Sequence, residues 1–194
     1  MSELEAISWT TDFLDWVPWI ETVDEVGVSA DQRARIDATL GSRAGSTYYE
    51  TLASDLESVR TRTLLFSDIF ESEGGVPRAD RELAATATSR INGCVYCASV
   101  HARLYGNLSK ERTLVRGLLD EGVTTSLPPH QRAIVDLSSK LTTDPESLTA
   151  ADLDRVRAIG ISDLGILDLI QSAAIFANAN RLMLTLGEPA RKRQ

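Results

Sequence analysis

The sequence has few cysteines and histidines, the usual zinc ligands, and it contains no long apolar run. Only two cysteines and two histidines occur among its 194 residues. A zinc site would therefore have to combine Cys94, Cys97, His101 and His130, without the second closely spaced ligand pair that zinc sites usually have. No apolar stretch approaches the roughly 20 residues of a membrane-spanning helix. We therefore expect neither a zinc protein nor a membrane protein.

Basic charge is also scarce. The chain has 20 lysines and arginines against 28 aspartates and glutamates, a formal net charge of −8 at pH 7. Nucleic-acid binding needs a basic face, so we expect no nucleic-acid partner. The N-terminus carries Glu3 and Glu5 and no apolar segment of the length that a signal peptide has. A cytoplasmic location in a reducing compartment is the expectation that follows.

Most of the sequence has the three- and four-residue spacing of apolar side chains that is typical of α-helices. Residues 47–70 show it most clearly, and the spacing predicts one long helix there. Further helices are expected between glycine and proline punctuation, including residues 78–91 and a helix from about 93 to 105 that stops at Gly106-Asn107. No segment shows a convincing strand alternation. The prediction is an all-α helical bundle of about seven or eight helices.

The two ends of the chain differ from the middle. Residues 1–28 look irregular and hold Trp9, Trp16 and Trp19, which are too apolar to be left in water. We expect this arm to pack on the domain or on a neighbouring subunit. Residues 29–188 form a single domain in this interpretation, and residues 189–194 form a basic, solvated tail.

Both cysteines and one histidine lie in a single short stretch. The separations between Cys94, Cys97 and His101 are three and four residues, which on a helix places all three on one face. Asn92-Gly93 indicates a helix start, where an anion such as a thiolate is favoured. His101 can act as a base or stabilise the thiolate.

Glu82 is the fourth candidate site residue. It lies on the predicted helix that precedes the cysteines. If that helix folds back near Asn92-Gly93, Glu82 reaches the same pocket and orients or deprotonates His101. A base held by a third group is the usual arrangement around an activated nucleophile.

Other interpretations of the cysteine pair remain open at this point. A structural disulfide or an inert thiol pair is one, although a chain of this size can bury a core without a crosslink. Haem attachment would need a histidine directly after the second cysteine, where Ala98 stands. A thioredoxin-like motif would need a βαβ context that the pattern lacks. Redox chemistry is the interpretation that the spacing favours most.

The stretch from Glu82 to His101 resembles the active-site pattern of the alkylhydroperoxidase D-like family. That pattern consists of a glutamate, eleven residues, Cys-x-x-Cys, three residues and a histidine. That family lies within the carboxymuconolactone decarboxylase superfamily. The segments 148–153 and 176–182 also resemble its uncharacterised peroxidase-related branch, so the resemblance spans roughly residues 46–187. Tyr96 stands where alkylhydroperoxidase D itself has a histidine between the cysteines, so a relay through that imidazole is not expected.

The resemblance implies a thiol peroxidase that needs no cofactor. It implies that Cys97 attacks the peroxide and that Cys94 then forms a disulfide with it, while His101 and Glu82 move the proton. A separation of three residues on a helix suits a disulfide. The implied partners are a peroxide substrate, a dithiol or lipoyl-type reductant protein and further copies of the chain, as a dimer, trimer or hexamer.

Two other functions remain open. The first is a peroxide-responsive redox sensor or interaction protein with little turnover. The second is a carboxymuconolactone decarboxylase-like enzyme that does not use the cysteines, although it would leave the complete set of Glu82, Cys94, Cys97 and His101 unexplained.

Overall fold

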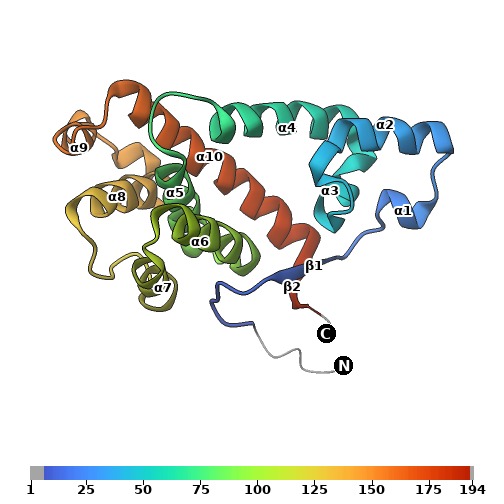
Figure 1. The fold of residues 1–194 in the computed structure, drawn as a ribbon, viewed down its shortest axis with the longest axis horizontal. Helices are drawn as coiled ribbons and strands as arrows, with labels where there is room; N and C mark the ends of the chain where they lie inside the picture. The colour runs from blue at the N-terminus through green and yellow to red at the C-terminus, as the bar shows by residue number, and fades with distance from the viewer. Residues whose placement is uncertain (1–6, 193–194) are drawn as a thin grey trace.

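The computed structural model describes residues 7–192, and within them the expected all-α class is confirmed (Figure 1). The described chain consists mainly of α-helices, with short 3-10 turns at residues 41–43, 53–55 and 145–147. The helices of the described range are α1 Val23–Val26, α2 Ala30–Leu40, α3 Thr47–Leu52, α4 Leu56–Glu71, α5 Arg78–Ile91, α6 Val95–Ser109, α7 Arg112–Glu121, α8 Pro129–Thr143, α9 Ala150–Arg157 and α10 Asp163–Leu186.

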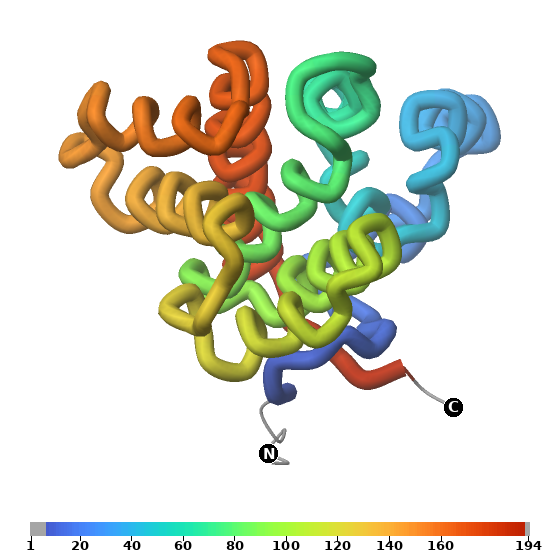
Figure 2. The backbone as a smooth tube through the Cα atoms, turned by 60° about the vertical axis from the view of Figure 1, so that its left-hand side comes forward, coloured from blue at the N-terminus to red at the C-terminus, as the bar shows by residue number. Residues whose placement is uncertain are grey.

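Helix α5 lies at the centre of the molecule. It packs against α6, α8 and α10, and ten of its 14 residues are buried. Small side chains such as Ala84, Ala85 and Ala87 are completely buried and let these neighbours approach closely. Figures 1 and 2 show α5 enclosed between the C-terminal helix α10 and the α6–α8 segment. The polar residues within 80–89 of α5 are therefore held in the protein interior.

The helices from α1 to α4 form the other side of the molecule (Figure 1). A separate small apolar cluster, which includes Val23, Ile36 and Leu40, joins them. The predicted single helix over residues 47–70 is wrong in one respect, because a 3-10 turn at residues 53–55 divides it into α3 and α4. Buried Ala53 lies in that turn and packs in the same cluster, so tertiary packing overrides the helical spacing here. This division and the short helix α1 account for a helix number above seven or eight.

A two-stranded antiparallel sheet joins the two ends of the described chain. Strand β1 (Leu14–Pro18) pairs with β2 (Gly187–Arg191), with Leu14 opposite Arg191. The sequence predicted an irregular arm at residues 1–28 and a tail at residues 189–194. Both strands are only five residues long and each contains a proline, Pro18 at the end of β1 and Pro189 in the middle of β2, so neither shows a strand pattern by itself.

The tryptophans of the N-terminal segment pack to different extents. Trp16 is buried, and its Nε1 donates to the Met183 carbonyl at 3.2 Å. Trp9 packs on the core, with the Arg90 guanidinium 4.2 Å from its ring centre. Trp19 is 59% exposed. The segment thus packs on its own domain, and residues 1–6 of the expected arm lie outside the described residues.

The cysteine helix is longer than expected. Gly106-Asn107 was predicted to end it, but α6 continues to Ser109 and Lys110 takes the left-handed conformation after it. Gly106 serves packing instead, since a Cβ at this position would lie 3.2 Å from Arg112 Cγ on α7. None of the helices within residues 7–192 combines the length and the apolar character that a membrane crossing requires.

Candidate active site

The corner between α5 and α6 places the two cysteines. Asn92 follows the last turn of α5, and Gly93 has a φ of +81°, a conformation that glycine adopts without strain. The Cys94 N–H donates to the Ser89 carbonyl at 3.0 Å and ties the corner down. Cys94 is the residue that caps α6, so Cys97 falls in its first turn. The helix start expected from Asn92-Gly93 is therefore present.

Both cysteines are free thiols that face each other in the protein interior. The Cys94 and Cys97 sulfur atoms lie 2.8 Å apart, and each residue is at most 3% exposed. Cys97 Sγ also lies 3.3 Å from Met183 Sδ on α10. The structure thus brings the pair together in an apolar cluster whose other members include Tyr48, Phe70, Ala85 and Phe176.

The two thiols have different electrostatic environments. The hydrogen bond with Cys97 lowers the pKa of Cys94, and this outweighs burial. Burial raises the pKa of the Cys97 thiol well above its usual range, and the neighbouring Cys94 adds to the effect. The resting negative charge of the pair is therefore favoured on Cys94, whereas the resemblance assigns the attack on peroxide to Cys97.

Asn180 connects α10 to this corner. Its side chain is completely buried, donates to Ser89 Oγ at 3.0 Å and accepts from the Asn92 amide at 3.0 Å. Hydrogen bonding by its side chain also lowers the pKa of both thiols. Asn180 thus holds the cysteine corner and stabilises negative charge there.

Glu82 and His101, 19 residues apart in the sequence, are brought into direct contact. Glu82 is fully buried on α5, and its Oε2 is hydrogen-bonded to His101 Nδ1 on α6. Its other oxygen accepts from Arg78 Nε at 2.6 Å. Burial acts to raise the pKa of Glu82, but His101 and Arg78 together outweigh burial and hold that pKa below its usual value. Glu82 is therefore a buried carboxylate with both oxygens paired.

The imidazole of His101 lies between this carboxylate and the aromatic side chains near the thiols. Its ring centre is 3.9 Å from that of Phe176 and 6.1 Å from that of Phe70. Both phenylalanines belong to the cluster that contains the cysteines. No hydrogen bond joins His101 to either sulfur within the described residues, so a proton would pass between them by way of substrate or water.

Two polar residues of this region did not emerge from the sequence. Tyr48 is only 6% exposed and belongs to the thiol-containing cluster. The Arg62 guanidinium lies 5.5 Å from the Tyr48 ring centre. The Tyr48 hydroxyl and Arg62 Nε and Nη1 are buried and have no hydrogen-bond partner in the described part of the chain. One signal was available: Arg62 interrupts the apolar stripe of α4, three residues after Val59 and four before Phe66.

Tyr96, which stands between the cysteines, packs its aromatic ring on the cluster that contains the thiols. It is half-buried, and burial raises the pKa of its hydroxyl. The other histidine lies elsewhere: His130 is 41% exposed in its side chain and contacts Asp80 at 2.9 Å. Burial raises the pKa of Asp80, and His130 opposes the rise. His130 is therefore a surface hydrogen-bond partner of Asp80 and does not join Cys94, Cys97 and His101.

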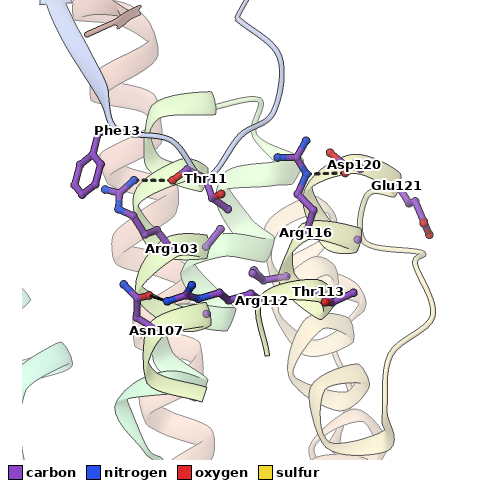
Figure 3. A pocket seen from close by; sticks show the side chains of 13 residues that line it. Thr11, Phe13, Arg103, Asn107, Arg112, Thr113, Arg116, Asp120 and Glu121 are labelled. Carbon is purple, nitrogen blue, oxygen red and sulfur yellow. Dashed lines mark hydrogen bonds and ion pairs between the residues drawn. The ribbon is translucent and has the colours of Figure 1, made fainter. Parts of the chain in front are cut away.

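A groove between α6, α7 and the N-terminal segment is rich in arginine (Figure 3). Its arginines already have partners: Arg103 donates to the Thr11 carbonyl at 3.1 Å, Arg112 to Asn107 and Arg116 to Asp120. None of the four predicted site residues lines it. The groove is thus separate from the thiol site.

Comparison with known proteins gives a consistent result. Residues 57–112, which contain Glu82, Cys94, Cys97 and His101, match the model of the carboxymuconolactone decarboxylase family. A search of curated proteins gives no match. Among solved structures, an uncharacterised peroxidase-related protein from Ralstonia eutropha JMP134, described as an alkylhydroperoxidase AhpD core, has a TM-score of 0.71 at 25% identity, covering 88% of each chain.

Two further solved structures share the fold. An uncharacterised peroxidase-related protein from Silicibacter sp. TM1040 has a TM-score of 0.72 at 22% identity, covering 89% of this chain and 93% of its own. The debrominase Bmp8 has a TM-score of 0.64 at 17% identity, covering 91% of each chain. These likenesses extend over nearly the whole chain, well beyond the matched family region.

Proposed function

Because the chain belongs to the carboxymuconolactone decarboxylase superfamily, in its alkylhydroperoxidase D-like group, we propose that it is a thiol-dependent peroxidase. Its substrates would be hydrogen peroxide or organic hydroperoxides. The observation that carries the proposal is the pair of free thiols, 2.8 Å apart, in one apolar cluster with the aromatic rings that contact His101. Glu82 holds that imidazole from the other side.

The proposed reaction begins with Cys97. As its sulfur attacks the peroxide, an S–O bond forms and the O–O bond breaks. The Cys97 proton passes to the neighbouring Cys94 thiolate, which is the route that the short sulfur–sulfur distance offers. The departing oxygen takes a proton through His101 and leaves as alcohol or water. Cys97 is then a sulfenic acid.

Cys94 completes the cycle. It gives up its proton to His101 and attacks the Cys97 sulfur, forming the disulfide as the sulfenic oxygen leaves as water. Two electrons and two protons from a dithiol or lipoyl-type donor then restore both thiols. In this scheme Glu82 keeps the imidazole oriented and compensates its charge. The proposal includes a cytoplasmic setting, where such reducing donors are present.

We further propose that the protein is a homo-oligomer. Several large apolar side chains are more than 45% exposed on α4 and α10, namely Leu64, Leu65, Leu164 and Leu167. Exposed apolar side chains of this size are frequent at subunit interfaces. Light scattering should therefore give a mass at least twice the 21.2 kDa of the chain, and a monomer at micromolar concentration would contradict this assembly.

A second candidate function is a peroxide-responsive sensor with little turnover. The near-complete burial of both sulfur atoms favours it, because it restricts access of a reductant protein. The two functions differ in steady-state peroxide consumption with a dithiol donor. A carboxymuconolactone decarboxylase-like activity would instead appear as lactone turnover that survives loss of both cysteines.

The test of the proposed function is peroxide-driven loss of free thiols in the reduced protein. One equivalent of peroxide should convert Cys94 and Cys97 into one intramolecular disulfide, with both thiols lost together. Cys97→Ser should not react. Cys94→Ser should react once and stop at a sulfenic acid that dimedone traps. If Cys97→Ser keeps the first step and Cys94→Ser loses it, Cys94 is the attacking thiol, as its lower pKa favours. If the wild type keeps its thiols, the protein is not a thiol peroxidase.

A further inference from the structure

Tyr48 and Arg62 form an incomplete polar site beside the thiols. Buried hydroxyl and guanidinium groups are normally hydrogen-bonded in proteins. The Tyr48 hydroxyl, Arg62 Nε and Arg62 Nη1 have no such partner within residues 7–192, and no carboxylate there pairs with Arg62. The fully buried Arg81 differs, since its Nη1 and Nη2 bond Asp168 at 2.9 Å and two backbone carbonyls, and only its Nε lacks a partner within the described residues. The unused donors of Tyr48 and Arg62 indicate a missing acceptor.

Arg62 lines a mainly apolar cavity of about 930 Å³ between α4 and α10. In Figure 1 the C-terminal end of α4 lies close to α10 and the two helices then diverge; they contact each other where they are close. The apolar part of the lining is formed by Leu65, Ile69, Ala174, Ile175 and Leu182. A cavity of this size and composition accommodates a small organic molecule with an apolar body.

Two acidic residues, Glu57 and Asp68, also line the cavity. Both are exposed, and Glu57 is paired with Arg60 at 2.6 Å. Neither forms an ion pair with Arg62. The positive charge of Arg62 is thus left available on the buried side of the cavity.

The cavity and the thiol site share walls. Ile69 and Ile175 line the cavity and also belong to the cluster that contains Cys94 and Cys97. Tyr48, beneath the Arg62 guanidinium, is a member of that cluster too. Arg62 also acts on the reacting group, because its charge favours the thiolate of Cys97 against the effect of burial. A molecule bound to Arg62 would therefore contact side chains of the cluster that contains the thiols.

We propose that the α4–α10 cavity binds an organic hydroperoxide that carries a carboxylate a few carbon atoms from the peroxide group. Arg62 pairs with the carboxylate, the Tyr48 hydroxyl donates to it, and the apolar walls hold the body of the molecule. A guanidinium is the side chain best suited to a carboxylate, which it can bind through two parallel hydrogen bonds. This substrate class rests on the proposed peroxidase function, but binding at the cavity does not depend on turnover.

The kinetic test compares two substrates that differ only in the carboxylate: cumene hydroperoxide and its para-carboxylated derivative. The ratio of their kcat/KM values isolates carboxylate recognition from thiol reactivity. Wild type should prefer the carboxylated substrate, and Arg62→Met should lower the ratio at least about tenfold, the loss expected for a charge-assisted hydrogen bond. Tyr48→Phe should lower it less. Arg116→Met, which changes an exposed arginine that pairs with Asp120 and does not line this cavity, should leave the ratio within about twofold.

Direct binding keeps the inference separate from the peroxidase proposal. Calorimetry with 4-isopropylbenzoate, which has no peroxide group, should show binding to the reduced wild type and to Arg116→Met but much weaker binding to Arg62→Met. Binding without peroxide turnover would support the cavity while refuting the peroxidase. Equal binding by wild type and Arg62→Met, or no binding at all, would overturn the inference. An equal loss of kcat/KM for both hydroperoxides in Arg62→Met would also overturn it, because Arg62 would then act only on the thiol.

Discussion

Two polar clusters adjoin the thiol-containing apolar cluster, and they differ in how completely their hydrogen bonds are made. In the first, Glu82 has both carboxylate oxygens occupied, one by His101 and one by Arg78. In the second, Tyr48 and Arg62 leave three buried polar atoms without a partner in the described residues. A complete network fixes the orientation of its members, whereas an incomplete one retains the capacity to bind.

Arg81 shows that burial alone does not create this difference. It is 2% exposed, yet Asp168 and the carbonyls of Ser72 and Gly74 accept from its Nη1 and Nη2, and only Nε lacks a partner in the described residues. Asp168 also accepts from the Val76 N–H at 3.1 Å. The Arg81–Asp168 ion pair holds the loop before α5 against α10, and it forms without a ligand. The comparison therefore separates a structural arginine from Arg62.

The largest expected effect comes from breaking the complete cluster. Glu82→Gln and His101→Ala should each slow peroxide reduction by roughly 10²- to 10⁴-fold at neutral pH, the usual contribution of general acid–base assistance. The double variant should be little slower than either single one, because the two residues act as one unit. Stopped-flow measurement of thiol oxidation gives these rates.

Raising the pH toward 9 should recover part of the lost rate in both variants, since the Cys94 thiolate that attacks the sulfenic acid then forms without His101. Arg116→Met is a suitable control, because it changes an exposed arginine that pairs only with Asp120 on its own helix. An unchanged rate and an unchanged pH profile in Glu82→Gln would mean that Glu82 is only a structural acid.

Stability should distinguish the two arginines. Arg81→Met leaves the Asp168 carboxylate without its ionic partner, and removing one member of a buried ion pair typically costs about 3–5 kcal/mol. Arg62→Met removes no hydrogen bond to a described residue and loses only the contacts with the rings of Tyr48 and Tyr49. We expect a change below about 1 kcal/mol. Urea denaturation of both variants measures the difference.

Equal destabilisation by Arg81→Met and Arg62→Met would contradict the comparison, because it would show that Arg62 has a structural partner. Arg81→Met together with Asp168→Asn provides the matched control. The double variant should be less destabilised than the sum of the single ones, since the unpaired charge is removed with its partner.

The complete cluster was accessible from the sequence, and the incomplete one was not. Glu82, Cys94, Cys97 and His101 lie within one helical hairpin, so spacing and the turn at Asn92-Gly93 were enough to bring them together. Their catalytic roles remain a prediction. The all-α class followed equally well from local spacing.

Contacts between distant segments account for what the sequence did not show. Arg62 meets Tyr48 only because the 3-10 turn at residues 53–55 changes the direction of the chain between α3 and α4. The β1–β2 pairing joins Leu14 to Arg191 across nearly the whole chain. In each case the interaction joins segments that are distant in the sequence, so the local sequence pattern does not predict it.

A smaller effect should appear in the pH dependence of stability. The pKa of Glu82 is lower in the folded protein than in the unfolded chain, so Glu82 binds fewer protons in the folded state over this pH range. This contribution is present above the unfolded pKa of about 4.3 and is lost as the pH falls through the lower folded value. Between pH 5 and 3, unfolding free energy should fall less steeply in Glu82→Gln than in wild type.

Glu57→Gln is the control for this measurement. The pKa of Glu57 is also lowered, by its hydrogen bond with Arg60, but both side chains are exposed and screened by solvent. Its slope should match that of wild type. If Glu82→Gln and wild type lose stability with the same slope, Glu82 is not a stabilised carboxylate in the folded protein.

The smallest expected effect concerns Tyr96, which lies between the two thiols in sequence but belongs to neither polar cluster. Its ring packs on the thiol-containing cluster, and burial raises the pKa of its hydroxyl, so it is a poor proton donor or acceptor near neutral pH. Tyr96→Phe keeps the ring and should slow peroxide reduction less than about tenfold, well below the effect of losing a general base. Tyr96→Ala should cost more, because it also removes the packing. A loss in Tyr96→Phe as large as that in His101→Ala, measured under the same stopped-flow conditions, would give the phenol a place in the proton relay and leave the Glu82–His101 pair insufficient on its own.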